Sequence, residues 1–250
     1  MRTIAAAPDF ASLARQRGVT LVELMVAMVI GLFLVVVVGT VFLGSKQMYL
    51  TQDANARLQE NARYAVEFFS RQLRSAGYDL IDFNPLSGSL YSVPSGTSFT
   101  GTALAGTDGG GSVSDTLTVS FSSPVDCLGN ATPSGTAINL IRLNVSNQLE
   151  CLGNGNPAAQ PILDEVEDLQ IRYGQAIGGN FGYVTAASAN MGIVTSVRLC
   201  LLLRASADAN KNYTDQQQSY VDCLGVTQTA ADRRIRRAVT TTITLRNRNP

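Results

Sequence analysis

Histidine and tryptophan are both absent from this chain of 250 residues. Because histidine is the usual general base and the commonest metal ligand, its absence excludes catalytic triads of the Ser-His or Cys-His kind. The glycine-rich phosphate loop, the Gly-x-Ser-x-Gly turn and the Cys-x-x-Cys pair are missing as well. The sequence therefore predicts a structural or binding protein and not an enzyme, with no cofactor and no metal site.

An excess of charge of one sign is also lacking, since 19 basic residues balance 19 acidic ones. Near-neutrality gives no overall attraction to nucleic acid, which we do not expect as a partner. One local run, Arg233–Arg237, holds four arginines and could contact phosphate, but no aromatic residue flanks it for base stacking. We interpret this run as a solvated or ion-paired strand entrance that faces the acidic stretch Asp164–Asp168.

Cysteine is scarce, and all four cysteines follow the longest apolar run of the chain. An even number beyond such a run is typical of an oxidising compartment. Three pairings are possible, and four buried thiols are the alternative. We predict the sequential pairing, Cys127–Cys151 and Cys200–Cys223, because it closes two loops of about 25 residues, each worth about 3.5 kcal/mol in the chain-entropy view.

One stretch is long and apolar enough to cross a membrane. Leu24–Leu43 contains no charge and would be about 30 Å long as a helix. Glu23 stands at its start, where a carboxylate in lipid costs about 2.5 kcal/mol or more and calls for a partner. Arg15 and Arg17 precede the run and Lys46 follows it, so we expect the N-terminus in the cytoplasm and the C-terminal domain in the periplasm.

The residues from Gly18 to Glu23 resemble the signal of type IV prepilins. In that family a short basic leader ends in glycine, and an apolar residue, Thr-Leu, another apolar residue and glutamate follow. The resemblance implies that prepilin peptidase cuts between Gly18 and Val19 and methylates the new N-terminus. It also implies that Glu23 pairs with the N-terminus of a neighbouring subunit in a filament. Val19 departs from the family, in which most members have phenylalanine at this position.

Two other targeting segments are alternatives, namely an ordinary signal anchor and a secretory signal peptide. The apolar run is longer than a usual signal-peptide core, and no Ala-x-Ala site closes it. A glutamate at the start of an ordinary anchor is rare.

The segment Ser45–Ala76 continues the helix with one apolar stripe, and Gly77 is suited to end it. Together with the apolar run it predicts one helix over Val19–Ala76, about 90 Å long. The stripe repeats at the helical period through these positions: Leu58, Ala62, Ala65, Val66, Phe69, Leu73 and Ala76.

After the helix the pattern changes to strands. Tyr78–Gly111 is rich in turn residues and predicts a long loop. Pro161–Tyr173 is ambiguous between a helical turn and a strand. The predicted strands are Asp115–Ser122, Ala137–Val145, Ile193–Leu203 and Ala238–Leu245. This order predicts an α+β fold, in which one long helix packs on a mainly antiparallel sheet.

Four later stretches resemble the PilW-type minor pilins of type IV pili: Asn61–Ala65, Leu73–Tyr78, Val166–Gly174 and Leu245–Arg248. The resemblance implies the pilin architecture and a minor pilin that helps to initiate pilus assembly within a complex of minor pilins, with a place at the pilus tip. Its implied partners are prepilin peptidase, other minor pilins, the major pilin, the membrane and the inner-membrane assembly platform. Two alternatives stay open: a J-type pseudopilin of type II secretion, and a tip adhesin or DNA-binding module.

These patterns divide the chain into four parts. Residues 1–18 form the leader, 19–44 the transmembrane or filament-core helix, 45–76 the amphipathic continuation of that helix, and 77–250 a periplasmic β-rich domain.

The stretch Asp208–Asp215 alternates oxygen-bearing side chains, as a calcium loop does at its start. Tyr213 then stands where that loop needs glycine, and Ser219 stands where it needs a closing glutamate. We interpret the stretch as a solvated hairpin tip between Cys200 and Cys223.

Overall fold

The computed structural model describes residues 18–79, 81–84, 89–92, 102–110, 113–206, 217–232 and 234–248. The leader before Gly18 and the stretch Asp208–Asp215 lie outside these residues. The chain divides after Met48 into two compact units, which are described separately below.

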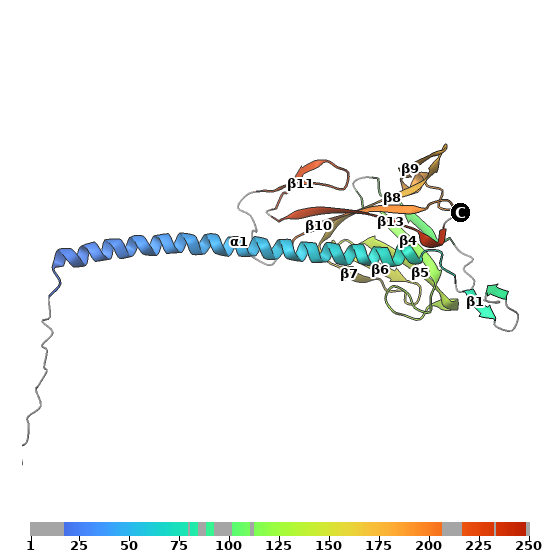
Figure 1. Ribbon diagram of the computed structural model, residues 1–250, viewed down its shortest axis with the longest axis horizontal. Helices are drawn as coiled ribbons and strands as arrows, with labels where there is room; N and C mark the ends of the chain where they lie inside the picture. Colours follow the sequence, from blue (N-terminus) through green and yellow to red (C-terminus); the bar gives the residue numbers. More distant parts are fainter. Residues whose placement is uncertain are drawn as a thin grey trace, which may run out of the picture. The chain divides into compact units, whose positions relative to one another are not determined.

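The long helix expected from the sequence is α1, Leu21–Ser75 (Figure 1). Its first backbone hydrogen bond runs from the Leu24 N–H to the Thr20 carbonyl, at 3.1 Å. At the other end Gly77 has a φ of 71°, a left-handed conformation that glycine adopts without strain. The expected boundaries, Val19 and Ala76, therefore differ from the observed ones by two residues and one residue.

The first unit contains the apolar part of α1. The large apolar side chains between Leu24 and Leu43 are 42% to 69% exposed, so nothing within this unit covers them. Among the described residues, α1 is the one helix that is long and apolar enough to cross a membrane.

The second unit, Tyr49–Pro250, buries the other half of the helix. Five residues of the predicted stripe are at most 2% exposed, as expected: Leu58, Ala65, Phe69, Leu73 and Ala76. The sequence pattern missed Phe68, which is also buried. The buried helical side chains share one hydrophobic core with inward-facing side chains from two β-sheets.

The first sheet has five antiparallel strands in the order β3-β4-β5-β6-β7. These are β3 (Leu104–Thr107), β4 (Thr116–Ser122), β5 (Thr136–Leu143), β6 (Leu149–Gly153) and β7 (Gln160–Leu163).

The second sheet has four antiparallel strands in the order β13-β10-β8-β9. These are β8 (Val166–Ile177), β9 (Asn180–Val184), β10 (Ser196–Arg204) and β13 (Arg236–Thr244).

Two small antiparallel ribbons and three short 3-10 helices complete the described elements. The ribbons are β1 (Ile81–Asn84) with β2 (Ser89–Ser92), and β11 (Ser219–Val221) with β12 (Thr227–Thr229). The 3-10 helices are η1 (Pro133–Gly135), η2 (Ala186–Ser188) and η3 (Arg246–Arg248).

The strands β6, β9, β11 and β12 were not predicted, and the stretches that were assigned need three corrections. The region Tyr78–Gly111 is not one loop, because it contains β1, β2 and β3. The ambiguous stretch Pro161–Tyr173 is divided between β7 and β8 at Glu165, whose φ of 60° breaks the extended backbone. β5 ends before Val145, which is fully exposed in the turn to β6.

Asp115 joins the two sheets. Its carboxylate accepts the N–H groups of Gly109 at 2.9 Å and of Ile171, in β8, at 2.7 Å. Its own N–H donates to the carbonyl of Leu169 at 2.8 Å. The segment that leads into β4 therefore runs along the edge of β8, which brings both inner faces onto one core.

The two disulfides of the structure are Cys127–Cys151 and Cys200–Cys223, with Cα–Cα distances of 6.6 and 5.6 Å. Beside the first, the fully buried amide of Asn139 accepts the Cys127 N–H and donates to Gln72 Oε1 of α1. This polar link fixes the helix against β5.

Candidate functional site

The predicted processing site lies just before the helix. Gly18, Val19 and Thr20 have no regular secondary structure and are exposed. A Cβ added at Gly18 would meet no atom within 4 Å. No packing contact among the described residues therefore requires glycine at this position.

Thr20 caps α1. Its Oγ1 accepts the N–H of Glu23 at 3.3 Å, and its carbonyl accepts the first helical N–H. Thr20 and Glu23 are spaced as in a capping box, in which the hydroxyl bonds the third helical N–H. The structure thus gives Glu23 a backbone contact, while its side chain has no hydrogen bond or ion pair with any residue that the structure describes.

The arginines of the run 233–237 divide between two environments. Arg236 holds Glu167 through two hydrogen bonds, from Nε at 2.6 Å and from Nη2 at 2.9 Å. Arg234 Nη2 contacts Glu165 Oε2, also at 2.6 Å. Arg237 is exposed, and Arg233 lies outside the described residues. The ion-paired strand entrance is therefore present for Arg234 and Arg236.

Arg204, which sequence reasoning missed, lies between the two glutamates. Its guanidinium reaches Glu165 at 2.7 Å and Glu167 at 3.1 Å. The sequence around Arg204 did not indicate these ion pairs, because they depend on how separate strands align in the sheet. The other two acidic residues of the stretch bind elsewhere: Asp164 accepts the Gln148 amide, and Asp168 accepts the Ser114 hydroxyl.

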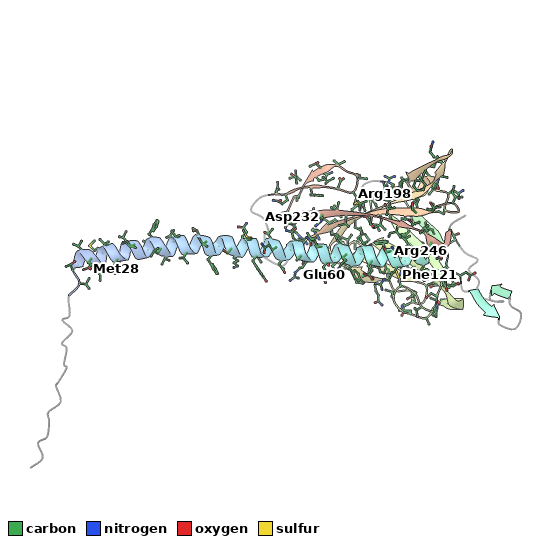
Figure 2. All side chains as sticks on the ribbon, in the orientation of Figure 1. Met28, Glu60, Phe121, Arg198, Asp232 and Arg246 are labelled. Atoms are coloured by element: carbon green, nitrogen blue, oxygen red, sulfur yellow. A yellow bond between two sulfur atoms is a disulfide. The ribbon has the colours of Figure 1, made fainter. Side chains whose placement is uncertain are left out.

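Charge pairing outweighs burial at Glu165. Burial raises the pKa of Glu165, but hydrogen bonds and charge from Arg204 and Arg234 more than offset it, so the pKa lies below its usual range. The Arg236 hydrogen bond holds the pKa of Asp232, labelled in Figure 2, below its usual range as well. Glu165 and Asp232 therefore stay ionised at neutral pH, while the pairs of Glu167 with Arg204 and Arg236 join β8 to β10 and to β13.

Two models of known protein families match different parts of the chain. The family described as type IV pilus-assembly protein W matches residues 132–247, and the prokaryotic N-terminal methylation motif matches residues 13–39. The two matches cover more than half of the chain.

No curated protein sequence matches the chain. A type IV-like pilin from Thermus thermophilus is similar in structure with a TM-score of 0.43 and 16% identity, over 77% of this chain and 99% of that chain. The family match and the motif match show that the C-terminal half of this chain is similar to type IV pilus-assembly protein W and that its N-terminal part carries a prokaryotic N-terminal methylation motif.

Proposed function

We propose that this minor pilin initiates pilus assembly within a complex of minor pilins and remains at the pilus tip. The observation that carries the proposal is the first unit of the structure, an apolar helix with nothing of its own to cover it. Lipid can cover such a helix before assembly, and the helices of other pilins can cover it afterwards. Its partners would be the membrane, other minor pilins, the major pilin and the inner-membrane assembly platform.

Processing by prepilin peptidase between Gly18 and Val19 is part of the proposal. The exposed, non-helical backbone of residues 18–20 supports it, because a peptidase needs an extended substrate. The open space around Gly18 supports it as well, since the need for glycine then comes from the peptidase and not from this chain's own packing.

Glu23 would act in docking. Its side chain has no partner in the described part of this chain, and an unpaired carboxylate is costly in an apolar setting. The methylated amino group of a neighbouring subunit supplies the opposite charge. Docking by this pair would align the helix so that the apolar stripes of major-pilin helices stack against it.

The proposal also divides the chain into four parts. Residues 1–18 would be the leader, 19–44 the membrane and filament-core helix, 45–76 its amphipathic continuation, and 77–250 the β-rich domain in the periplasm. The basic residues before the helix support this orientation. Two disulfides in the β-rich domain support an oxidising compartment.

Counting surface pili tests the role directly. Deleting the gene, or replacing Glu23 by alanine, should reduce pilus number steeply, while the remaining pili consist of normal major pilin. Glu60→Ala, which removes an exposed carboxylate from the same helix, should leave the number unchanged.

Two results would favour the alternatives. An unchanged pilus number, with a secreted enzyme accumulating in the periplasm, would replace the proposal by the J-type pseudopilin. Unchanged pilus number with lost adhesion or DNA uptake would favour a tip adhesin or DNA-binding module.

A further inference from the structure

β13 is a long strand at the edge of the four-stranded sheet. It pairs with β10 over nine residues without a register shift, and no strand pairs with its other side in the part of the chain that the structure describes. The other edge strands of the two large sheets are shorter, with four residues each in β3 and β7 and five in β9. β7 also contains Pro161, which has no N–H to offer. β13 is therefore the longest open edge of these sheets.

The backbone groups of β13 alternate between the two sides of the strand. Ala205 donates its N–H to the Ile235 carbonyl at 2.9 Å, so every second residue from Ile235 onward bonds β10. The residues between them turn their N–H and carbonyl groups away from β10. These are Ala238, Thr240, Thr242 and Thr244, and no described residue forms a hydrogen bond with these backbone groups. Because buried N–H groups without a partner are rare, we infer that they face solvent.

The open edge begins after Arg236. The ring of Tyr220, in β11, lies 5.4 Å from the Arg236 guanidinium carbon, so β11 accompanies only the start of the strand. The remaining stretch, Ala238–Thr244, contains no charge, no proline and no bulge, which are the features that usually prevent strands from adding to an edge. All of its residues except Ala238 are β-branched and favour extended backbone. The edge is thus a regular template for one more strand.

The side chains of β13 indicate what an added strand would contain. Val239, Thr241 and Ile243 alternate on the core side, and Val239 is only partly buried where it packs against the hydrophobic core. An apolar side chain beside Val239 would extend that core. Thr240 and Thr242 are exposed on the opposite side. The added strand should therefore alternate apolar residues on the core side with polar residues on the outer side.

Charge indicates where the added strand comes from. Arg237 and Arg246, which Figure 2 labels, lie at the two ends of the open edge and are exposed, and neither forms an ion pair within the described ranges. The acidic residues at the start of the strand, Glu167 and Asp232, are already bound to Arg236. β13 itself contains no acidic residue, so a β13 strand of a second copy could not supply the opposite charge. An acidic segment of a different chain can.

We propose that the open edge of β13 binds an extended segment of another pilin subunit by strand addition. The segment alternates apolar and polar residues and carries an acidic residue beside Arg237. Main-chain hydrogen bonds to Ala238–Thr244 supply the affinity, and the alternating side chains supply the specificity. That the partner is a pilin rests on the proposed function, whereas the binding mode rests on the geometry of β13 alone.

The test uses the full chain in non-ionic detergent and a fluorescein-labelled synthetic peptide, Thr-Val-Thr-Val-Thr-Val-Glu, with binding read by anisotropy. Thr240→Pro removes one N–H of the open edge and should weaken binding about tenfold or more. Thr240→Ala is the matched control, because it keeps that N–H, and its affinity should stay within about twofold of the unchanged protein. Equal affinities of the two variants, or no binding of the peptide to the unchanged protein, would overturn the proposal.

Two N-methylated peptides keep the test independent of the folding of any variant. In an added strand, alternate N–H groups face β13 and the others face away. Methylation of one alternate set should abolish binding, and methylation of the other set should leave it unchanged. Equal binding of the two methylated peptides would contradict strand addition.

The charge of the segment is tested at Arg237. Arg237→Ala should weaken binding of the glutamate peptide about threefold, as expected for an exposed ion pair, and should not change binding of the same peptide ending in glutamine. An equal change for both peptides would overturn the proposed acidic contact.

Pilus counts separate this inference from the proposed function. Thr240→Pro should reduce pilus number relative to Thr240→Ala. A reduction by Glu23→Ala but not by Thr240→Pro would overturn the pilin partner and leave the proposed function standing. No reduction by either variant would overturn the proposed function, while the peptide measurements would still decide whether strands add to β13.

Discussion

Asp126 joins two turns through one buried side chain. Its Oδ1 accepts the N–H groups of Leu128 and Asn130, each at 2.9 Å, and its Oδ2 accepts the N–H of Gly155 at 3.1 Å. The first two bonds close the turn that carries Cys127, and the third reaches the turn after β6. Because both turns flank the disulfide to β6, this carboxylate should support the loop independently of the covalent bond.

Replacing Asp126 by alanine should lower the free energy of unfolding by about 2–4 kcal/mol, because buried N–H groups lose their acceptor. Urea unfolding of the full chain in detergent measures this. Asp222→Ala is the matched control, since Asp222 also accepts two N–H groups, of Leu224 and Val226, but in an exposed turn. Its loss should be smaller, and an equal loss would contradict the account.

The effect of Asp126 should depend on pH. Burial raises its pKa, but the N–H donors more than offset this, so the pKa in the folded state lies below the usual value. The stabilisation is then complete above the unfolded-state pKa of about 4 and is lost as pH falls through the lower folded-state value. The stability difference between the unchanged protein and Asp126→Asn should therefore shrink below about pH 4. A difference that stays constant down to acid unfolding would contradict this assignment.

The strands β8, β10 and β13 are held at one end by the cluster of Glu165, Glu167, Arg204, Arg234 and Arg236. Arg236 is the most buried of these arginines, with 8% of its side chain exposed. Removing one partner from such a group leaves the remaining charges buried without compensation.

Arg236→Ala should therefore lower the free energy of unfolding by about 3–5 kcal/mol. The neighbouring Arg237 is exposed, so Arg237→Ala should change it by less than about 0.5 kcal/mol. Urea unfolding of the two variants in parallel gives the comparison. Equal effects would show that the cluster contributes little to the association of these strands.

The elements that the sequence predicted are those with a long or regular apolar pattern. α1 was expected within two residues at each end, and β4, β10 and β13 near their observed ranges. The missed strands are short or mixed in composition. β6 places Glu150 between apolar residues, and β9 is an edge strand whose side chains rest on Gly174. Such strands form because neighbours pair with them, which one segment's pattern does not reveal.

The candidate sites likewise differ in how far the sequence predicts them, because some are contiguous in the chain and others form only on folding. The signal Gly18–Glu23 is contiguous in sequence and could be predicted, and the approach of Arg236 to the acidic stretch followed from charge. The place of Arg204 between Glu165 and Glu167 could not be predicted, because these residues come from separate segments of the chain. Only the register of the sheet brings these residues together.

At the scale of the whole molecule, the two units differ in whether their apolar side chains are buried or exposed. The β-rich unit buries its apolar side chains in one core and stabilises it with two disulfides. The helical unit has no core, and its apolar side chains must be covered by lipid or by other helices. The need of the apolar half of α1 for such a cover agrees with the matches to a pilus-assembly family and to the N-terminal methylation motif.

The account depends most directly on where the mature protein begins. Mass spectrometry of the protein purified from piliated cells should find an N-methylated Val19 as the first residue, about 2 kDa lighter than the full chain because some 18 residues are removed. Replacing Gly18 should leave the heavier precursor. Detection of Met1 as the first residue of the protein in piliated cells would contradict processing at Gly18 and, with it, the proposed entry of this chain into the pilus.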